Sequence, residues 1–76
     1  MKLVHISTLR KMLRAGGELN IKFWDTNGNI IVANQVVVTS SHFKPETVNI
    51  KFIISGAIRK VHVVTIFEIN DMEVYI

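Results

Sequence analysis

The chain has no cysteine and only one proline. Without cysteine it can form neither a disulfide nor a thiolate metal site, which is typical of proteins from a reducing compartment. No apolar run approaches the roughly 20 residues of a transmembrane helix. The apolar start of the chain also breaks at His5, before the seven or so residues that a signal-peptide core needs. We therefore expect a cytoplasmic protein with no membrane partner.

The sequence also lacks the residue patterns of an enzyme. Its six acidic residues are scattered among expected turns and strand ends. Ser41 and His42 are adjacent, so on an extended chain they would point to opposite faces and could not form a nucleophile and its base. The three histidines, His5, His42 and His62, lack the spacing of metal ligands, and the glycines never form a phosphate-binding loop. We predict no enzyme activity, metal, cofactor or small-molecule substrate.

The short chain limits the core that it can build. Its 76 residues make a single domain, residues 1–76, and a chain of this size buries only about 60% of its unfolded surface. Hydrophobic residues nevertheless make up 49% of the sequence, which is at the upper end of the usual range. The surplus favours either a homo-oligomer or a larger protein partner.

Three turn signals divide most of the chain into hairpins. Asn27-Gly28 is the strongest, because both residues tolerate the positive φ of a two-residue turn. Ser55-Gly56 and Asn70-Asp71 repeat the signal more weakly. This spacing predicts a mainly β protein whose strands are locally connected into a small barrel.

One segment has the period of a helix, from Ser7 as N-cap to Ala15. Gly16-Gly17 ends the pattern. The helix is amphipathic, with an apolar face of Ile6, Leu9, Met12 and Leu13 and an opposite cationic face of Arg10, Lys11 and Arg14. Solvent exposure and a favourable interaction with the helix dipole explain those cations without any ligand. Ligand binding is the alternative explanation.

The remaining segments alternate as strands do. We expect strands at Glu18–Asp25, Ile30–Val38, Val48–Ile54 and Ala57–Val63, and a closing hairpin of Thr65–Ile69 with Met72–Ile76. Inward positions are Leu19, Ile21 and Phe23 in the first of these, and Val48, Ile50, Phe52 and Ile54 in the third. In Ala57–Val63 one strongly polar residue must lie at a rim. Ser40–Glu46 is expected to be an irregular loop that could carry binding residues.

The strand Ile30–Val38 is apolar on both faces at each of its ends and therefore needs two covers. One cover is the barrel interior. The other is either the helix alone or a neighbouring subunit. On the second alternative, the interface would include Ile31, Val37, Phe43 and Tyr75.

Three segments and the helix before them suggest a family. Phe23–Ile30, Gly56–Val61 and Ile66–Ile69 together resemble small SH3-like barrel proteins of unknown function encoded by tailed phages and gut-bacterial mobile elements. The resemblance implies an SH3-like barrel of five to six antiparallel strands with one short N-terminal helix. It implies no functional residue.

Two function classes remain. The preferred one is a protein-interaction or self-assembly module that uses the apolar strand and the C-terminal edge. The alternative is an accessory protein that binds the phosphate backbone of nucleic acid without sequence preference, through cations and a stacking aromatic ring. Its candidate contacts are Arg10, Lys11, Arg14, Trp24, Arg59 and Lys60. The net charge of +3 is too mild to decide, and Trp24 could instead pack under the helix or across its hairpin.

Overall fold

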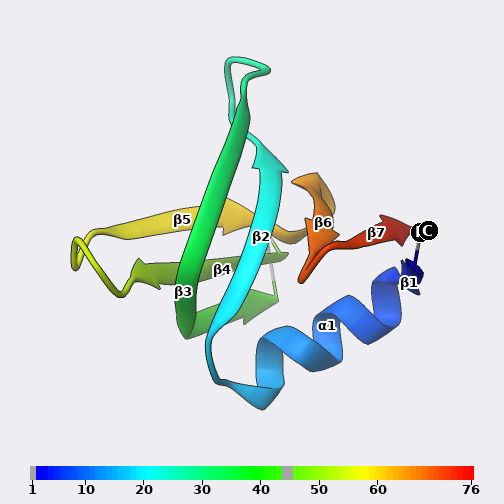
Figure 1. Ribbon diagram of the computed structural model, residues 1–76, viewed down its shortest axis with the longest axis horizontal. Coiled ribbons are helices and arrows are strands. Elements are labelled where there is room, and N and C mark those ends of the chain that lie inside the picture. Colours follow the sequence, from blue (N-terminus) through cyan, green and yellow to red (C-terminus); the bar gives the residue numbers. More distant parts are fainter. Residues whose placement is uncertain (1, 44–45) are drawn as a thin grey trace.

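The computed structural model describes residues 2–43 and 46–76, without the side chain of Phe43. Seven strands and one α-helix follow one another along this chain, with one 3-10 turn between the fifth and sixth strands (Figure 1). Their bounds are β1 Lys2–His5, α1 Ile6–Ala15, β2 Leu19–Trp24, β3 Ile30–Phe43, β4 Glu46–Phe52, β5 Ile58–His62, η1 Val63–Thr65, β6 Ile66–Ile69 and β7 Met72–Tyr75.

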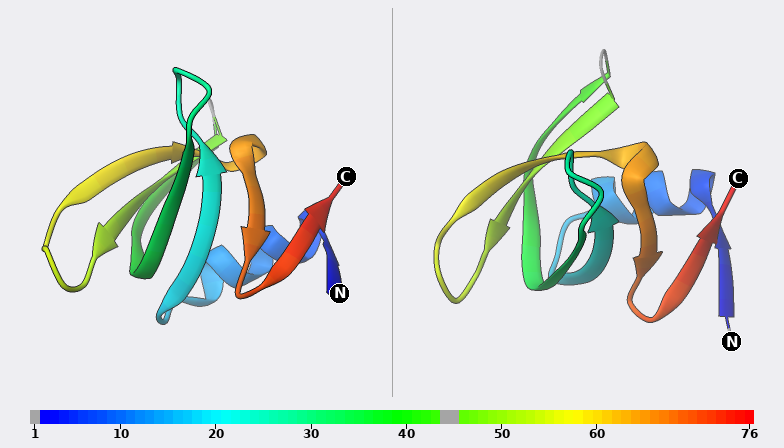
Figure 2. Two further views of the ribbon diagram at one scale, coloured as in Figure 1. Left: turned by 45° about the horizontal axis from the view of Figure 1, so that its top comes forward. Right: turned by 90° about the horizontal axis from the view of Figure 1, so that it is seen from above.

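The strands form one mixed sheet in the order β1-β7-β6-β2-β3-β4-β5. The mainly β class is confirmed, but the expectation that all strands are antiparallel is wrong, because β1 pairs with β7 in parallel. Nor does the sheet close, since β1 and β5 are its two edges. Strand β1 was not predicted, and only Val4 of its four residues is buried. Both chain ends lie at the β1 side of the sheet (Figure 2).

Helix α1 covers the concave side of the sheet with Ile6, Leu9 and Leu13, all of which are buried. Its N-cap is His5 rather than Ser7, so the helix begins two residues earlier than predicted. The His5 Nδ1 accepts a hydrogen bond from the Ser7 backbone N–H at 3.1 Å. The helix ends at Gly16 as expected, because Gly16 and Gly17 adopt φ of 79° and 88°, a region that glycine enters without strain.

Strand β3 is 14 residues long and bends at Gln35, whose φ is 54°. Two steps along β2, from Leu19 to Ile21, face three steps along β3, from Val36 back to Ala33. This β-bulge places Ala33 and Val36 on the same buried face, although they are three positions apart. The first half of β3 therefore pairs with β2, and the second half pairs with β4.

Asn20 holds this bend in place. Its side-chain Oδ1 accepts a hydrogen bond from the Gln35 N–H at 2.9 Å. Its own backbone N–H donates to Asn70 Oδ1 at 3.0 Å, and its carbonyl accepts from the Asn70 N–H at 2.7 Å. One residue of β2 thus joins the bend of β3 to the turn between β6 and β7.

Two expectations about the middle of the chain are wrong. Ser40–Phe43 continues β3 and Glu46 begins β4, so these residues form strands rather than a loop; Lys44 and Pro45 lie outside the described residues. Ile54 was expected to point inward, but it is 85% exposed because β4 ends at Phe52 and residues 53–55 form a turn. Val48 and Ile50 are buried as predicted.

All three expected turns exist, but the first is of a different type. Gly28 has φ of 81°, whereas Asn27 does not have a positive φ. The Gly28 N–H donates to the Asp25 carbonyl at 3.1 Å, and the Asp25 N–H donates to the Asn29 carbonyl at 3.0 Å. This is a type I turn followed by a left-handed glycine. At the last turn, by contrast, Asn70 and Asp71 both have positive φ, as a two-residue turn requires.

Replacing Gly28 tests this turn. Gly28→Val should lower the free energy of unfolding by more than about 1 kcal/mol, because a β-branched residue is strained at positive φ. A Cβ there would meet no atom within 4 Å, so conformation alone causes the loss. Asn27→Ala is the control and should change stability by under about 0.5 kcal/mol. Urea unfolding measures both, and equal losses in the two variants would contradict the assigned turn.

Candidate binding surfaces

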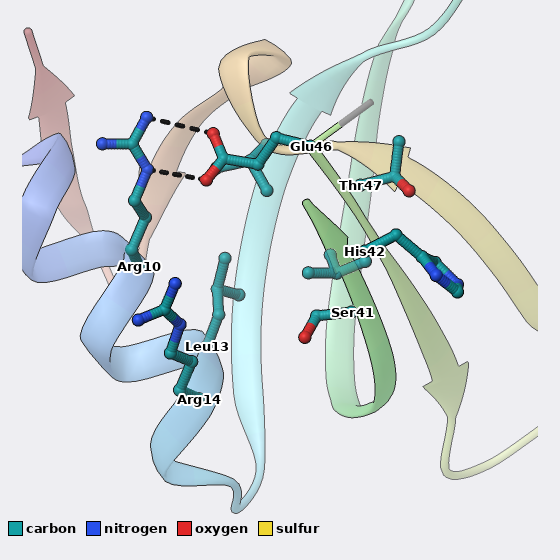
Figure 3. Close-up of a pocket in the computed structure, with 9 residues that line it drawn as sticks. Arg10, Leu13, Arg14, Ser41, His42, Glu46 and Thr47 are labelled. Carbon is teal, nitrogen blue, oxygen red and sulfur yellow. Dashed lines mark hydrogen bonds and ion pairs between the residues drawn. The ribbon is translucent and has the colours of Figure 1, made fainter. Parts of the chain in front are cut away.

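The first candidate surface is an open cleft between α1 and the β3–β4 hairpin (Figure 3). Arg10 of the helix donates from Nε and Nη2 to the two carboxylate oxygens of Glu46, at 2.8 and 3.0 Å. These hydrogen bonds raise the pKa of Arg10 above its usual value. The guanidinium is therefore committed to fastening the helix to the start of β4, and it is only partly available to a phosphate group.

Of the other two helix cations, one lines this cleft and the other does not. Arg14 lines the cleft together with Arg10. Lys11 is exposed on the helix and does not line the cleft. The helix thus brings two of the three predicted cations, Arg10 and Arg14, to the same cleft.

Ser41 and His42 line the same cleft but point apart, the Ser41 hydroxyl toward the helix and the His42 ring away from it (Figure 3). They have the alternating directions of neighbouring residues on a strand. Beside them Thr47 is fully buried, and its Oγ1 has no hydrogen-bond partner among the described residues. The side chains here are not arranged as a nucleophile with its base.

A second cleft brings three of the predicted nucleic-acid contacts together. Trp24, at the end of β2, lines it with Arg59 and Lys60 of β5. Arg59 is the polar residue that the sequence analysis expected at the rim of the sheet. It lies on the same side of β5 as the buried Val61, but it is exposed, and its guanidinium lies 5.7 Å from the ring centre of Phe23. The six residues proposed for nucleic acid are therefore divided between the helix and this second cleft.

Asp25 adds a negative charge to the wall of the second cleft. Its Oδ1 accepts hydrogen bonds from the backbone N–H groups of Asn29, at 2.8 Å, and Asn27, at 2.9 Å. Those bonds, the one from Asn29 foremost, lower the pKa of Asp25 below its ordinary 3.8, and the charge of Arg59 adds to the effect. The carboxylate thus stays ionised in the folded protein and orders the β2–β3 turn.

The convex side of the sheet carries apolar side chains that no other described element covers. Trp24 and Ile30 are paired across β2 and β3, and they are 45% and 53% exposed. Val32 is 52% exposed, and Phe67 of β6 packs against the Trp24 ring at 5.4 Å between centroids. We call these four residues the outer apolar face. At its border Lys22 Nζ forms an ion pair with Glu68 Oε2 at 2.9 Å.

The predicted interface residues lie elsewhere. Ile31 packs against the core, so Ile30 and Val32 are the outward positions of this strand. Val37 is half-buried opposite Lys51. Tyr75 is 49% exposed at the other end of the sheet, where its ring meets His5 edge-on at 5.2 Å. The side chain of Phe43 lies outside the description.

The sequence analysis missed Ile30 and Val32 because the strand that contains them is apolar on both faces. The alternation of side chains between the two faces of a strand was the available signal. Ala33 is buried on the core side, so the residues one and three positions before it, Val32 and Ile30, face outward. Trp24 packs neither under the helix nor wholly in the core, but across the sheet against Phe67.

Comparison with models of protein families, with curated proteins and with solved structures finds no match to this chain. In residues 2–43 and 46–76, no three metal-binding side chains come together as a metal site would require. No described helix is long and apolar enough to span a membrane.

The ionisation of Asp25 predicts a pH dependence of stability. Because folding lowers the pKa of Asp25, its contribution is fully present above the unfolded value of 3.8 and is lost as the pH falls through the folded value. Asp25→Asn retains the oxygen acceptor but not the charge. The free energy of unfolding, measured by urea titration from pH 6 to pH 2.5, should therefore fall less steeply in Asp25→Asn than in the wild type. Parallel curves would show that Asp25 is not coupled to folding.

Proposed function

We propose that this protein is a small non-enzymatic module that self-associates through the outer apolar face. The supporting observation is that Trp24, Ile30 and Val32 lie side by side on one face and remain about half exposed. Helix α1 buries its apolar residues in the concave side of the sheet and leaves this face open. Contiguous apolar surface of this kind on a small domain is typical of an interaction site.

A second copy of the chain suits this face in shape and in charge. Two sheets can pack face to face about 10 Å apart, with the side chains of each filling the gaps of the other. In a two-fold arrangement both copies present the same patch. Each copy then supplies one Lys22 and one Glu68, so the border of the interface is self-complementary in charge. An apolar centre with a polar rim is the usual anatomy of an interface.

We further propose that β2 to β6 are an open variant of the SH3-like barrel, as in the phage and mobile-element proteins that the chain resembles. Five neighbouring strands in the order β6-β2-β3-β4-β5, the strong bend in β3 and the 3-10 turn before β6 support this assignment. In this arrangement β7 and β1 extend the sheet beyond the barrel.

Binding of a nucleic-acid backbone has weaker support. Its six candidate residues fall into two separate groups, and Arg10 of the helix group is paired with Glu46. The second cleft also contains an ionised carboxylate, which repels phosphate. Self-association accounts for the exposure of Trp24, Ile30 and Val32, whereas nucleic-acid binding uses only the Trp24 ring among these three.

The double variant Ile30→Thr with Val32→Thr tests self-association. Threonine retains the β-branched shape that strands favour but removes apolar area from the face. We expect the wild type to dimerise as its concentration rises, and the variant to have a dissociation constant at least about tenfold higher, equivalent to about 1.4 kcal/mol. Light scattering after size-exclusion chromatography, over a concentration series, measures the mass directly.

Ile54→Thr is the matched control, because Ile54 is 85% exposed in the β4–β5 turn and is not part of the outer apolar face. It should dimerise as the wild type does. A wild type that stays monomeric at millimolar concentration would refute the proposal. So would a loss of dimer in Ile54→Thr equal to the loss in the double variant.

A further inference from the structure

Strand β5 is an edge strand with unused backbone hydrogen-bonding groups. It pairs only with β4, and it is the last strand in the sheet order. Figure 2 shows β5 running from the β4–β5 turn, which lies far from the chain ends, back toward η1. At its C-terminal end, the Thr65 Oγ1 hydroxyl donates to the His62 carbonyl, at 2.7 Å. The remaining outward N–H and C=O groups can accept another strand.

The second cleft lies directly along this edge. Four consecutive residues of β5, Arg59–His62, line one side of it, and Phe23 and Trp24 of β2 line the other. A chain that paired with β5 would therefore lie in the cleft, with one side chain against the half-exposed Trp24 ring. Trp24 is the single tryptophan of the protein.

The charges along β5 indicate which chain would fit. Arg59 and Lys60 are adjacent and exposed, and His62 follows on the Lys60 side of the strand. Neither Lys60 nor His62 forms an ion pair with any described carboxylate. Pairing of β5 with β5 of a second copy would bring these cations together, and like charges across a strand pair are unfavourable. The edge therefore disfavours a copy of itself and favours an acidic strand.

Backbone chemistry separates a peptide from a nucleic acid. A β-strand presents alternating donors and acceptors, so it can satisfy both the N–H and the C=O groups of β5. A phosphodiester backbone offers only acceptors to this edge and would leave its carbonyls unpaired. The Asp25 carboxylate in the cleft wall also repels phosphates. A peptide can instead place its apolar side chain there.

We propose that the β5 edge and the second cleft bind an extended acidic segment of a partner protein, which adds to the sheet as an eighth strand. Affinity comes from the backbone hydrogen bonds, and selectivity comes from Arg59, Lys60 and His62 together with an apolar contact at Trp24. This goes beyond self-association, because the partner is a different chain. The second cleft shares Trp24 with the outer apolar face, but Ile30 and Val32 do not line it.

The test uses an acetylated and amidated seven-residue peptide that alternates glutamate with valine. Tryptophan fluorescence follows binding, and the amide shifts of Ile58–His62 in ¹⁵N-labelled protein locate it. The peptide should bind, and its lysine-for-glutamate counterpart should bind at least tenfold more weakly. Two peptides, N-methylated on one or the other set of alternate amides, retain the charges. The one that blocks the pairing edge should also lose at least tenfold.

Protein variants complete the test. Lys60→Glu should weaken binding at least tenfold, whereas Lys51→Glu, an equal change of charge on β4, should weaken it less than threefold. The double variant Ile30→Thr with Val32→Thr should bind the peptide as the wild type does. Peptide binding can therefore be judged even if the protein does not self-associate.

Three outcomes would overturn the proposal. They are absence of binding by the glutamate peptide, equal binding by both N-methylated peptides, and tighter binding of a seven-nucleotide thymidine oligomer in the same cleft. The third would instead assign the cleft to single-stranded nucleic acid.

Discussion

The bend of β3 at Gln35 determines the rest of the structure. A residue other than glycine at φ of 54° costs on the order of 1 kcal/mol. Two hydrogen bonds hold it there, from the Gln35 N–H to Asn20 Oδ1 and from the Ile53 N–H to the Gln35 carbonyl. Because of the bend, a single strand can pair with β2 and then with β4 while it keeps Ala33 and Val36 in the core.

This coiled sheet has two unlike sides and two unlike edges. Its concave side is filled by buried aliphatic residues and covered by α1, which the Arg10–Glu46 pair fastens to β4. Its convex side carries the outer apolar face. At one edge β1, the first strand, pairs with β7, the last. At the other edge β5 presents cationic side chains and backbone N–H and C=O groups that no strand pairs with. The two proposed binding surfaces are parts of the sheet that the chain itself leaves uncovered.

The sequence predicted those features that depend on local pattern. The helix, its glycine stop and the inward positions of β2 follow from period and turn chemistry, and all are observed. The bulge could not be predicted, because Gln35 is not a residue type that marks positive φ, and Asn20, which holds it, lies 15 residues earlier. The parallel strand β1 depends wholly on a partner at the far end of the chain, so four residues with one buried side chain carried no signal of it.

The candidate sites likewise divide into features set by local sequence and features set by long-range pairing. Residue type alone indicated Trp24, Arg59 and Lys60, and the fold places them in one cleft. Their separation from the helix cations depends on the sheet order, which no local pattern contains. An apolar outer face was expected because Ile30–Val38 is apolar on both faces. To decide whether Ile31 or its neighbours point outward, one must first know which side of the strand faces the core.

The central claim is that the convex face of the sheet packs against a second copy while the rest of the surface does not. A dilution series of ¹⁵N- and methyl-labelled protein, followed by NMR, tests it most directly. The account predicts that the Trp24 indole and the Ile30 and Val32 methyl signals shift together with concentration, while those of Ile54 and Ile58 do not. Signals that stay constant over the whole series, or shifts confined to the β4–β5 turn, would contradict it.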